Sequence, residues 1–198
     1  MIGPVAATFV FGAMSPYSWF SAERIDQLLP DADWRSVFLG AIFNARGRKS
    51  WGFDERRAAG MADCEARAKA YGLGEISWPQ RWPTNDLHVA RAMLIAARGG
   101  LLKPYALTAM RMAFREGADL EEIATVLEAG RRVGMDAGEL EAGVSDPEVK
   151  GALRAATDEA LALGVFGVPT VLVGEQLFWG DDRLAEAAGA VGTPSAGA

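Results

Sequence analysis

The stretch Ala7-Thr8-Phe9-Val10-Phe11-Gly12-Ala13-Met14-Ser15-Pro16-Tyr17 determines how the fold begins. Residues 7–11 are β-branched and aromatic and are followed by a glycine, which predicts a short buried strand. Ser15 stands directly before Pro16, the order that the N-cap and the first position of a helix favour. The chain is therefore expected to open with a strand followed at once by a helix.

The next segment extends this opening to β-α-β. The helix is expected to run to about Leu29, because Pro30 cannot continue it. Residues 34–39, Trp-Arg-Ser-Val-Phe-Leu, have the composition of a second strand. A strand, helix and strand in succession favour a parallel pair.

From about residue 53 to residue 164, nearly every segment places apolar residues at helical spacing, with Gly, Pro or Asp between segments. Asp86, Pro104 and the pair Asp146-Pro147 are suitable helix starts. We expect helices near residues 53–71, 86–98, 104–116, 119–129, 136–143 and 146–164.

Strand patterns return after Gly164. Residues 169–173 and 176–179 are apolar and are separated by Gly174-Glu175, so a two-residue turn is expected to join them as an antiparallel hairpin. A last helix is expected to begin within residues 180–184 and to end near Ala190. Residues 192–198 have little apolar surface and are expected to form a loose tail.

The order β-α-β, helical block, β-β-α is that of a thioredoxin-like domain interrupted by an insertion. The expected fold is therefore α/β with one mixed sheet. Residues 1–44 and 165–191 are expected to form the thioredoxin-like domain. Residues 45–164 are expected to form an all-helical insertion.

Composition narrows the range of functions. The 198 residues are 50% hydrophobic and carry a net charge of −6, from 20 basic and 26 acidic side chains. Such a balance gives no concentrated positive surface for nucleic acid or anionic lipid. No apolar stretch approaches the ~18 residues needed to span a bilayer. We therefore expect a cytoplasmic protein that acts on a small molecule, with neither nucleic acid nor membrane as partner.

Cysteine and histidine are scarce. Cys64 is the one cysteine and His88 the one histidine. An intrachain disulfide, a Cys-x-x-Cys redox pair, a cysteine-rich zinc site and a site with two imidazoles are all impossible, and we expect no metal. Cys64 stands between Asp63 and Glu65, whose charges raise a thiol pKa, so it is expected to be inert.

Three places carry candidate chemistry, and Ser15 is the first. At the start of a helix beside the sheet edge, its hydroxyl and the nearby N–H groups favour an anion. Alternatively, Ser15 is only an N-cap.

The second candidate is Val168-Pro169 before a strand. A cis bond at this proline would leave the backbone groups of Val168 unpaired and able to bind an extended, peptide-like ligand. Alternatively, a trans proline merely starts an edge strand.

The third candidate is Gly180-Asp181-Asp182-Arg183 at the start of the last helix. Its two carboxylates and adjacent N–H groups can hold the ammonium and carboxylate of an amino-acid head group. Alternatively, the acidic residues only complement the helix dipole.

These motifs together carry a resemblance. Residues 9–19, 164–170 and 178–184, in this order and spacing, resemble the 2-hydroxychromene-2-carboxylate isomerase family. That family is close to kappa-class glutathione transferases and belongs to the DsbA-like thioredoxin group. The resemblance extends over nearly the whole chain, including residues 39–43 and 83–85.

The resemblance implies a glutathione-dependent homodimer of aromatic catabolism. Ser15 would hydrogen-bond the glutathione sulfur, and Val168, before a cis-Pro169, would pair with the cysteinyl backbone. Asp181 and Asp182, with the amides near Gly180 and Arg183, would hold the γ-glutamyl end. The thiolate of glutathione, or of another small thiol, would add reversibly to an unsaturated aromatic acid and permit rotation about the former double bond.

The same resemblance leaves two other functions open, a kappa-like transferase and a thioredoxin-like module that binds a partner without catalysis. The substrate also stays open, because family members commonly have Lys where this chain has Asn44 and Asn where it has Arg48. Arg46 or Arg48 can instead supply a cation for a substrate carboxylate. Asn85 is a candidate pocket residue or an ordinary turn residue. Several tryptophans are candidates for an aromatic wall or for core packing: Trp19, Trp51, Trp78 and Trp82.

Overall fold

Strand β1 lies inside a four-stranded sheet whose order is β2-β1-β3-β4. It pairs in parallel with β2 and antiparallel with β3, and β3 pairs antiparallel with β4. The computed structural model describes residues 6–191, so the tail expected at residues 192–198 lies outside the described residues. The bounds of the strands are β1 Ala7–Phe11, β2 Asp33–Ser36, β3 Thr170–Val173 and β4 Gln176–Trp179. The α/β fold with one mixed sheet is confirmed.

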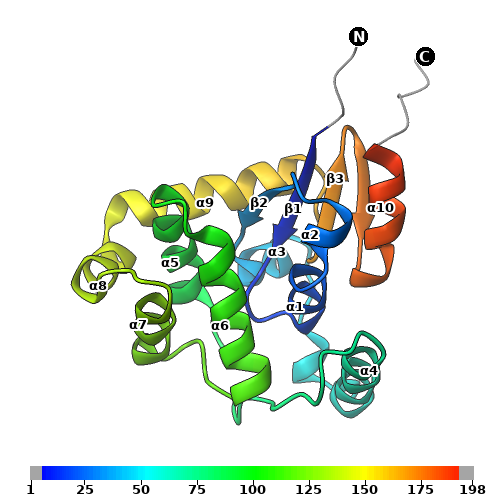
Figure 1. Cartoon of the computed structure of the whole chain (residues 1–198), viewed down its shortest axis with the longest axis horizontal. Helices are drawn as coiled ribbons and strands as arrows, with labels where there is room; N and C mark the ends of the chain where they lie inside the picture. Colours follow the sequence, from blue (N-terminus) through cyan, green and yellow to red (C-terminus); the bar gives the residue numbers. More distant parts are fainter. Residues whose placement is uncertain (1–5, 192–198) are drawn as a thin grey trace.

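The helices lie around this sheet, with α5 to α8 on one side and α10 on the other (Figure 1). Their bounds are α1 Pro16–Ala22, α2 Ile25–Leu28, α3 Leu39–Ala45, α4 Arg57–Ala70, α5 Leu87–Arg98, α6 Leu102–Glu116, α7 Ile123–Arg132, α8 Ala137–Ser145, α9 Pro147–Ala162 and α10 Leu184–Val191. Two 3₁₀ turns, η1 (Trp51–Phe53) and η2 (Asp181–Arg183), precede α4 and α10.

Alternation along β1 divides the apolar interior into two clusters, because successive strand residues point to opposite faces. Phe9 and Phe11 face the larger cluster, where both rings lie within 5.0–5.4 Å of the Trp34 ring, centroid to centroid. Val10 faces the smaller cluster with Leu172 and Val168. Both faces of the sheet are therefore packed, and its strand ends are left to form a site.

Three local expectations differ from the structure. The first helix is broken into α1 and α2, because the backbone N–H of Arg24 bonds the carbonyl of Ser21 instead of continuing the α-helical pattern. The second strand ends at Ser36 rather than at residue 39. Residues 39–45 form α3, for which Phe38 is the N-cap.

Candidate functional site

A cavity of about 670 Å³ opens where the start of α1, the loop before β3, and η2 come together. Segments far apart in the sequence meet here. The cavity is lined by Met14, Ser15, Pro16, Tyr17, Leu39, Phe43, Arg48, Lys49, Ser50, Trp51, Arg56, Arg67, Trp82, Gly167, Val168, Pro169, Trp179, Gly180, Asp181, Asp182 and Arg183. All three stretches with candidate chemistry, and Arg48, therefore face one space, which we call the first cavity.

Ser15 is the N-cap of α1. Its backbone is extended, with φ −92° and ψ 115°, and its Oγ accepts a hydrogen bond from the Ser18 N–H at 3.2 Å. The N–H of Ser15 in turn donates to the Gly12 carbonyl at 3.2 Å. Because the oxygen acts as acceptor inside the cap, the hydroxyl hydrogen is left to donate into the cavity. Capping and ligand binding are thus compatible roles for Ser15.

The loop before β3 presents an unpaired edge of backbone. The Val168-Pro169 bond is cis, the isomer that the sequence left open. Among residues 6–191, no hydrogen bond engages the N–H or the carbonyl of Val168, whereas the Pro169 carbonyl accepts from the Gly180 N–H at 3.0 Å. A donor and an acceptor at Val168 are therefore free to pair with an extended ligand in the manner of an added strand.

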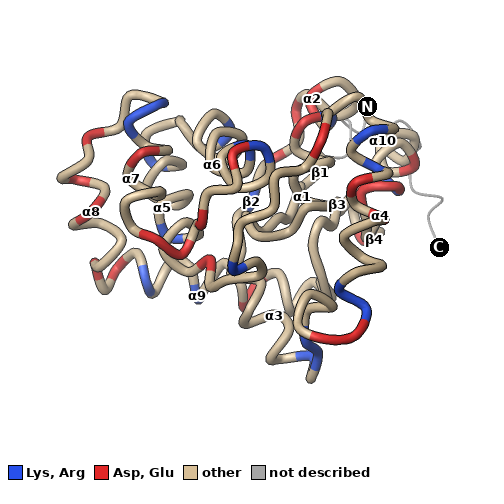
Figure 2. The backbone as a smooth tube through the Cα atoms, turned by 90° about the horizontal axis from the view of Figure 1, so that it is seen from below, with Lys and Arg blue, Asp and Glu red and all other residues tan. Residues whose placement is uncertain are grey.

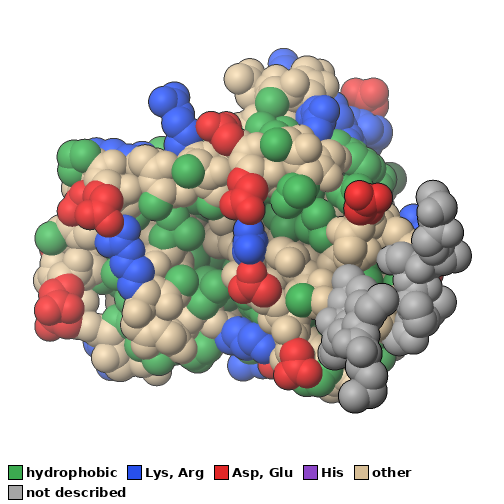
Figure 3. Space-filling model, turned by 90° about the horizontal axis from the view of Figure 1, so that it is seen from above, with side chains coloured by type: hydrophobic (Ala, Val, Ile, Leu, Met, Phe, Trp, Pro, Cys, Tyr) green, Lys and Arg blue, Asp and Glu red, His purple; other side chains and the backbone are tan. Residues whose placement is uncertain are grey.

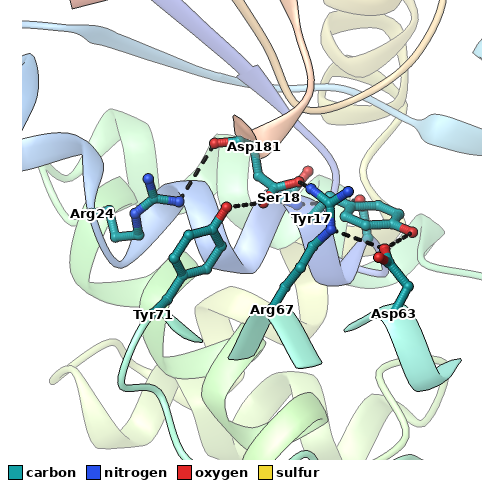
Figure 4. Close-up of polar contacts among 8 residues, drawn as sticks. Tyr17, Ser18, Arg24, Asp63, Arg67, Tyr71 and Asp181 are labelled. Carbon is teal, nitrogen blue, oxygen red and sulfur yellow. Dashed lines mark hydrogen bonds and ion pairs between the residues drawn. The ribbon is translucent and has the colours of Figure 1, made fainter. Parts of the chain in front are cut away.

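The two carboxylates of η2 differ in their surroundings. Asp181 is buried, and its side chain accepts from Arg67 at 3.0 Å and from the Tyr71 hydroxyl at 2.8 Å (Figure 4). Arg67 also pairs with Asp63 at 2.9 Å, and the Arg24 guanidinium lies 3.8 Å from the centre of the Tyr71 ring. Asp181 thereby ties η2 to α4.

Asp182 is exposed instead, and no hydrogen bond or ion pair among the described residues engages its carboxylate. Gly180 has φ +116°, and a side-chain carbon at that position would collide with Asp182 Oδ1. Glycine therefore lets the Asp182 carboxylate lie over the backbone at the mouth of the cavity. Of the pair, Asp182 is the one able to bind a ligand ammonium.

Because Asp181 is buried and paired and Asp182 is exposed and unpaired, we expect the same substitution to affect stability differently at the two positions. Asp181→Asn is expected to lower the free energy of unfolding by about 2–3 kcal/mol, because it leaves the Arg67 contact without its buried charge partner. Asp182→Asn is expected to stay within about 0.5 kcal/mol of the wild type. Urea unfolding of both variants checks this, and equal losses for the two would contradict the assignment.

Two unpaired cations and an indole complete the rim. Neither Arg48 nor Lys49 forms an ion pair among the described residues; Arg48 donates to the Phe166 carbonyl at 3.3 Å. The Arg48 guanidinium lies 5.7 Å from the centre of the Trp179 ring, which packs against Phe166. This rim suits an anionic group.

The DSBA-like thioredoxin domain family matches residues 7–192. The chain belongs to that family. It is also 27% identical over 186 residues to a 2-hydroxychromene-2-carboxylate isomerase of Sphingobium xenophagum, with 89% of this chain and 92% of the relative covered.

Solved structures agree with this DSBA-like assignment at the level of the fold. A 2-hydroxychromene-2-carboxylate isomerase structure superposes with a TM-score of 0.83 at 20% identity, covering 94% of each chain. A probable DsbA oxidoreductase from Streptomyces coelicolor superposes with a TM-score of 0.75 at 19% identity, covering 94% of this chain and 89% of that one.

In this DSBA-like chain, two of the candidate substrate residues lie elsewhere. Asn44 is exposed on α3 and does not line the first cavity. Asn85 is also absent from that cavity; its Oδ1 accepts from the Leu87 N–H at 3.0 Å, so it acts as a turn residue at the start of α5. Asn85 lines a neighbouring cavity instead.

The four candidate tryptophans differ in whether they line the first cavity. Trp51 and Trp82 line the first cavity, whereas Trp19 is fully buried against Phe114. Trp78 packs on Trp82, 4.6 Å between ring centres, behind the cavity wall. Sequence reasoning gave no role to Trp179, although it directly precedes Gly180, or to Arg67, whose partner Asp181 is 114 residues away.

Cys64 lies behind the cavity, inside α4. Burial raises the pKa of its thiol to about 12, and the carboxylates of Asp63 and Asp181 act in the same direction. Its reaction with a thiol reagent at pH 8 is therefore expected to be roughly a thousandfold slower than that of free cysteine. Stopped-flow labelling with a disulfide reagent checks this, with the urea-unfolded chain as control; rapid labelling of the native protein would contradict it.

Proposed function

We propose that this protein is a glutathione-dependent isomerase of an unsaturated aromatic compound. The observation that supports it best is the meeting of the Ser15 hydroxyl and the unpaired Val168 backbone in one cavity. The relative of Sphingobium xenophagum is named for the same class of reaction. The thiol comes from outside, because this chain's own Cys64 is buried and inert.

In the proposed complex, glutathione would lie extended along the polar groups of the first cavity. Its cysteinyl N–H and carbonyl would pair with the Val168 backbone. The γ-glutamyl ammonium would meet Asp182, and the far carboxylate would meet Arg48 or Lys49. Asp181 would support this end through the packing of η2 rather than by direct contact.

The Ser15 hydroxyl would then donate to the glutathione sulfur and favour the thiolate over the thiol. A free thiol with a pKa of about 8.5 is only about 3% ionised at pH 7. Lowering that pKa by about 2 units, a free-energy change of about 2.7 kcal/mol, makes the thiolate the major species. Helix α1 has seven residues, so the hydroxyl rather than a long helix dipole has to supply most of this effect.

In the proposed reaction, the thiolate adds to the unsaturated compound and is later eliminated from it. A C–S bond forms at the β-carbon of the unsaturated carbonyl compound, and the π electrons move to the carbonyl oxygen. The former double bond rotates as a single bond, the electrons return, and the C–S bond breaks. Atoms and charge balance without an oxidant, and the thiolate is regenerated.

The ultraviolet absorbance of the thiolate tests this proposal. Adding glutathione to the protein at pH 7 is expected to raise the thiolate absorbance well above the sum of the separate solutions. Cys64 does not interfere, because its pKa lies far above this pH. A transferase would give the same rise but would release the adduct. A binding module without catalysis would give no rise, and that outcome would overturn the proposal.

For partners and location, the proposal keeps the predictions made above: a cytoplasmic protein with no nucleic-acid or membrane partner, and the homodimer that the resemblance implies. Charged residues of both signs are interspersed along the helices (Figure 2). On the face seen in Figure 3, Lys and Arg lie among acidic and hydrophobic side chains. Within residues 6–191, no helix has the length and apolar character required to cross a bilayer.

A further inference from the structure

Asp86, at the N-cap of α5, is a buried carboxyl group that the proposed function does not use. Its side chain is 3% exposed in the fold, and its Oδ2 has no hydrogen-bond partner among the described residues. Burial raises the pKa of this carboxyl group, and the nearby backbone N–H groups of Asp86 and Met14 offset that effect only in part. An unsatisfied buried oxygen is costly, so its position beside the site requires an explanation.

The position of Asp86 connects it to the thiol-binding edge. A side-chain carbon built at Gly12 would come within 3.3 Å of Leu39 Cβ, 3.5 Å of Val168 Cγ2 and 3.7 Å of Asp86 Oδ2. The carboxyl group and the Val168 side chain therefore both lie close to Gly12. Met14, which lines both the first cavity and the second cavity described below, immediately precedes Ser15.

Asp86 also lines a second cavity, of about 510 Å³. Four residues line both the first and the second cavity, so the two adjoin: Met14, Leu39, Phe43 and Ser50. The second cavity also has an apolar part, formed by Phe38, Phe53 and Pro83. An aromatic ring placed here would lie in a cavity that adjoins the one lined by Ser15.

Around the second cavity acidic side chains outnumber basic ones, and the one cation of its described wall is paired. Arg81 and Glu121 are the other ionisable residues of its wall. Arg81 pairs with Asp119 at 2.8 Å and with Glu122 at 2.6 Å, and lies 3.9 Å from Glu121. The described wall therefore offers no unpaired cation for a ligand carboxylate.

We propose that the second cavity binds an uncharged aryl enone and that the Asp86 carboxyl group donates a hydrogen bond to its carbonyl oxygen. As the C–S bond forms, negative charge develops on that oxygen, and the Asp86 proton moves toward it. The proton returns to Asp86 when the C–S bond breaks, so no co-reactant is needed. Burial supports this role because it raises the pKa of Asp86 to about 7, which keeps much of the group protonated near neutral pH.

This inference rests on the proposed function and narrows its substrate. The resemblance implies an aromatic acid, whereas the paired Arg81 and the excess of carboxylates around the second cavity favour a neutral ketone. The unpaired Arg48 and Lys49 face the first cavity, where the carboxylates of the thiol would lie.

A matched pair of enones tests the charge preference. The glutathione-dependent cis-to-trans isomerisation of 4-phenyl-3-buten-2-one is compared with that of 2-oxo-4-phenyl-3-butenoate, which carries a carboxylate on the same framework. Each enzymatic rate is divided by the uncatalysed rate, because the two compounds differ in reactivity. We expect at least about a tenfold larger enhancement for the neutral ketone. An equal or larger enhancement for the carboxylate would overturn the preference.

Variants of Asp86 test the donor. Asp86→Leu is expected to lower kcat/KM for the ketone by about 100-fold, whereas Asp86→Asn, which keeps an N–H donor, is expected to retain more. The wild-type rate is expected to level or fall above pH 7 as the carboxyl ionises, and this limb should vanish in Asp86→Asn. An unchanged rate in Asp86→Leu, or an unchanged limb in Asp86→Asn, would overturn the role.

Two controls separate this inference from the proposed function. The thiolate absorbance with glutathione alone is expected to be unchanged in both variants, since Ser15 is intact. Binding of the ketone without thiol, measured by quenching of tryptophan fluorescence, is expected to weaken about tenfold in Asp86→Leu. Absence of the thiolate signal in the wild type would reject the proposed function, whereas equal ketone binding by the wild type and Asp86→Leu would reject the Asp86 contact.

Discussion

Replacing Ser15 with alanine is expected to abolish the rise in thiolate absorbance that glutathione produces at pH 7. Without the hydroxyl donor, the pKa of the bound thiol returns toward about 8.5, and the thiolate fraction falls from a majority to about 3%. The rate of any addition reaction at pH 7 should fall with it, by at least about tenfold. The change is read directly from the ultraviolet difference spectrum at saturating glutathione.

Ser50 provides a matched control for this experiment. It lines the same cavity, and its Oγ accepts from the Gly52 N–H at 3.2 Å. Ser50→Ala should leave the thiolate signal intact. Ser15→Ala also removes the cap of α1, at a cost of about 1 kcal/mol, so an unfolding curve must show that the variant is folded. A folded Ser15→Ala protein with the full thiolate signal would contradict the role of Ser15.

The second large effect concerns stability and pH at Asp86. Burial raises its pKa from 3.8 to about 7. Between these values the unfolded chain ionises while the folded protein keeps Asp86 neutral, so the folded state loses stability as pH rises. Above pH 7 both states are ionised and the loss is constant. A shift of about 3 units corresponds to about 4 kcal/mol.

Asp86→Asn removes this titration with little change of shape. The difference in unfolding free energy, variant minus wild type, is expected to rise by about 4 kcal/mol between pH 4 and pH 8. Urea unfolding across this range measures it, and the comparison cancels groups that titrate in both proteins. A difference that does not change with pH would show that Asp86 is ionised normally in the fold. This test requires no ligand and is independent of the proposed function.

The sequence predicts the sheet well because its signals are local. Alternating apolar residues and the Gly174-Glu175 turn specify the β3–β4 hairpin, and the β1 pattern specifies a strand packed on both faces. Asp146-Pro147 likewise starts α9 as expected, with Asp146 accepting from the Glu148 N–H at 2.6 Å. In these places a few neighbouring residues determine the backbone.

Features determined by distant contacts were missed. No proline or glycine marks the break between α1 and α2. At this break the Glu23 side chain accepts from Trp19 at 2.8 Å and from Arg111 on α6, 88 residues away. The sequence analysis also did not predict helix α3. It extended the second strand to Leu39, whereas the strand ends at Ser36 and Leu39 begins the helix.

In the candidate site, too, local motifs were predictable and features that depend on distant contacts were not. Ser15, Val168 and Asp182 stood out from local motifs, and the structure brings them to one cavity. The sequence could not distinguish Asp181 from Asp182, because the difference lies in Arg67 on α4 and in Tyr71, which directly follows that helix. Nor could it separate an ordinary helix cap from the buried carboxyl group at Asp86 with its unpartnered Oδ2, since burial there depends on segments distant in the sequence, such as that of Gly12.

A crystal structure of the protein soaked with glutathione tests the central claim most directly. We expect the sulfur within hydrogen-bond distance of Ser15 Oγ and the cysteinyl backbone paired with Val168. Glutathione bound elsewhere, or a first cavity that stays empty at saturating thiol, would contradict the account.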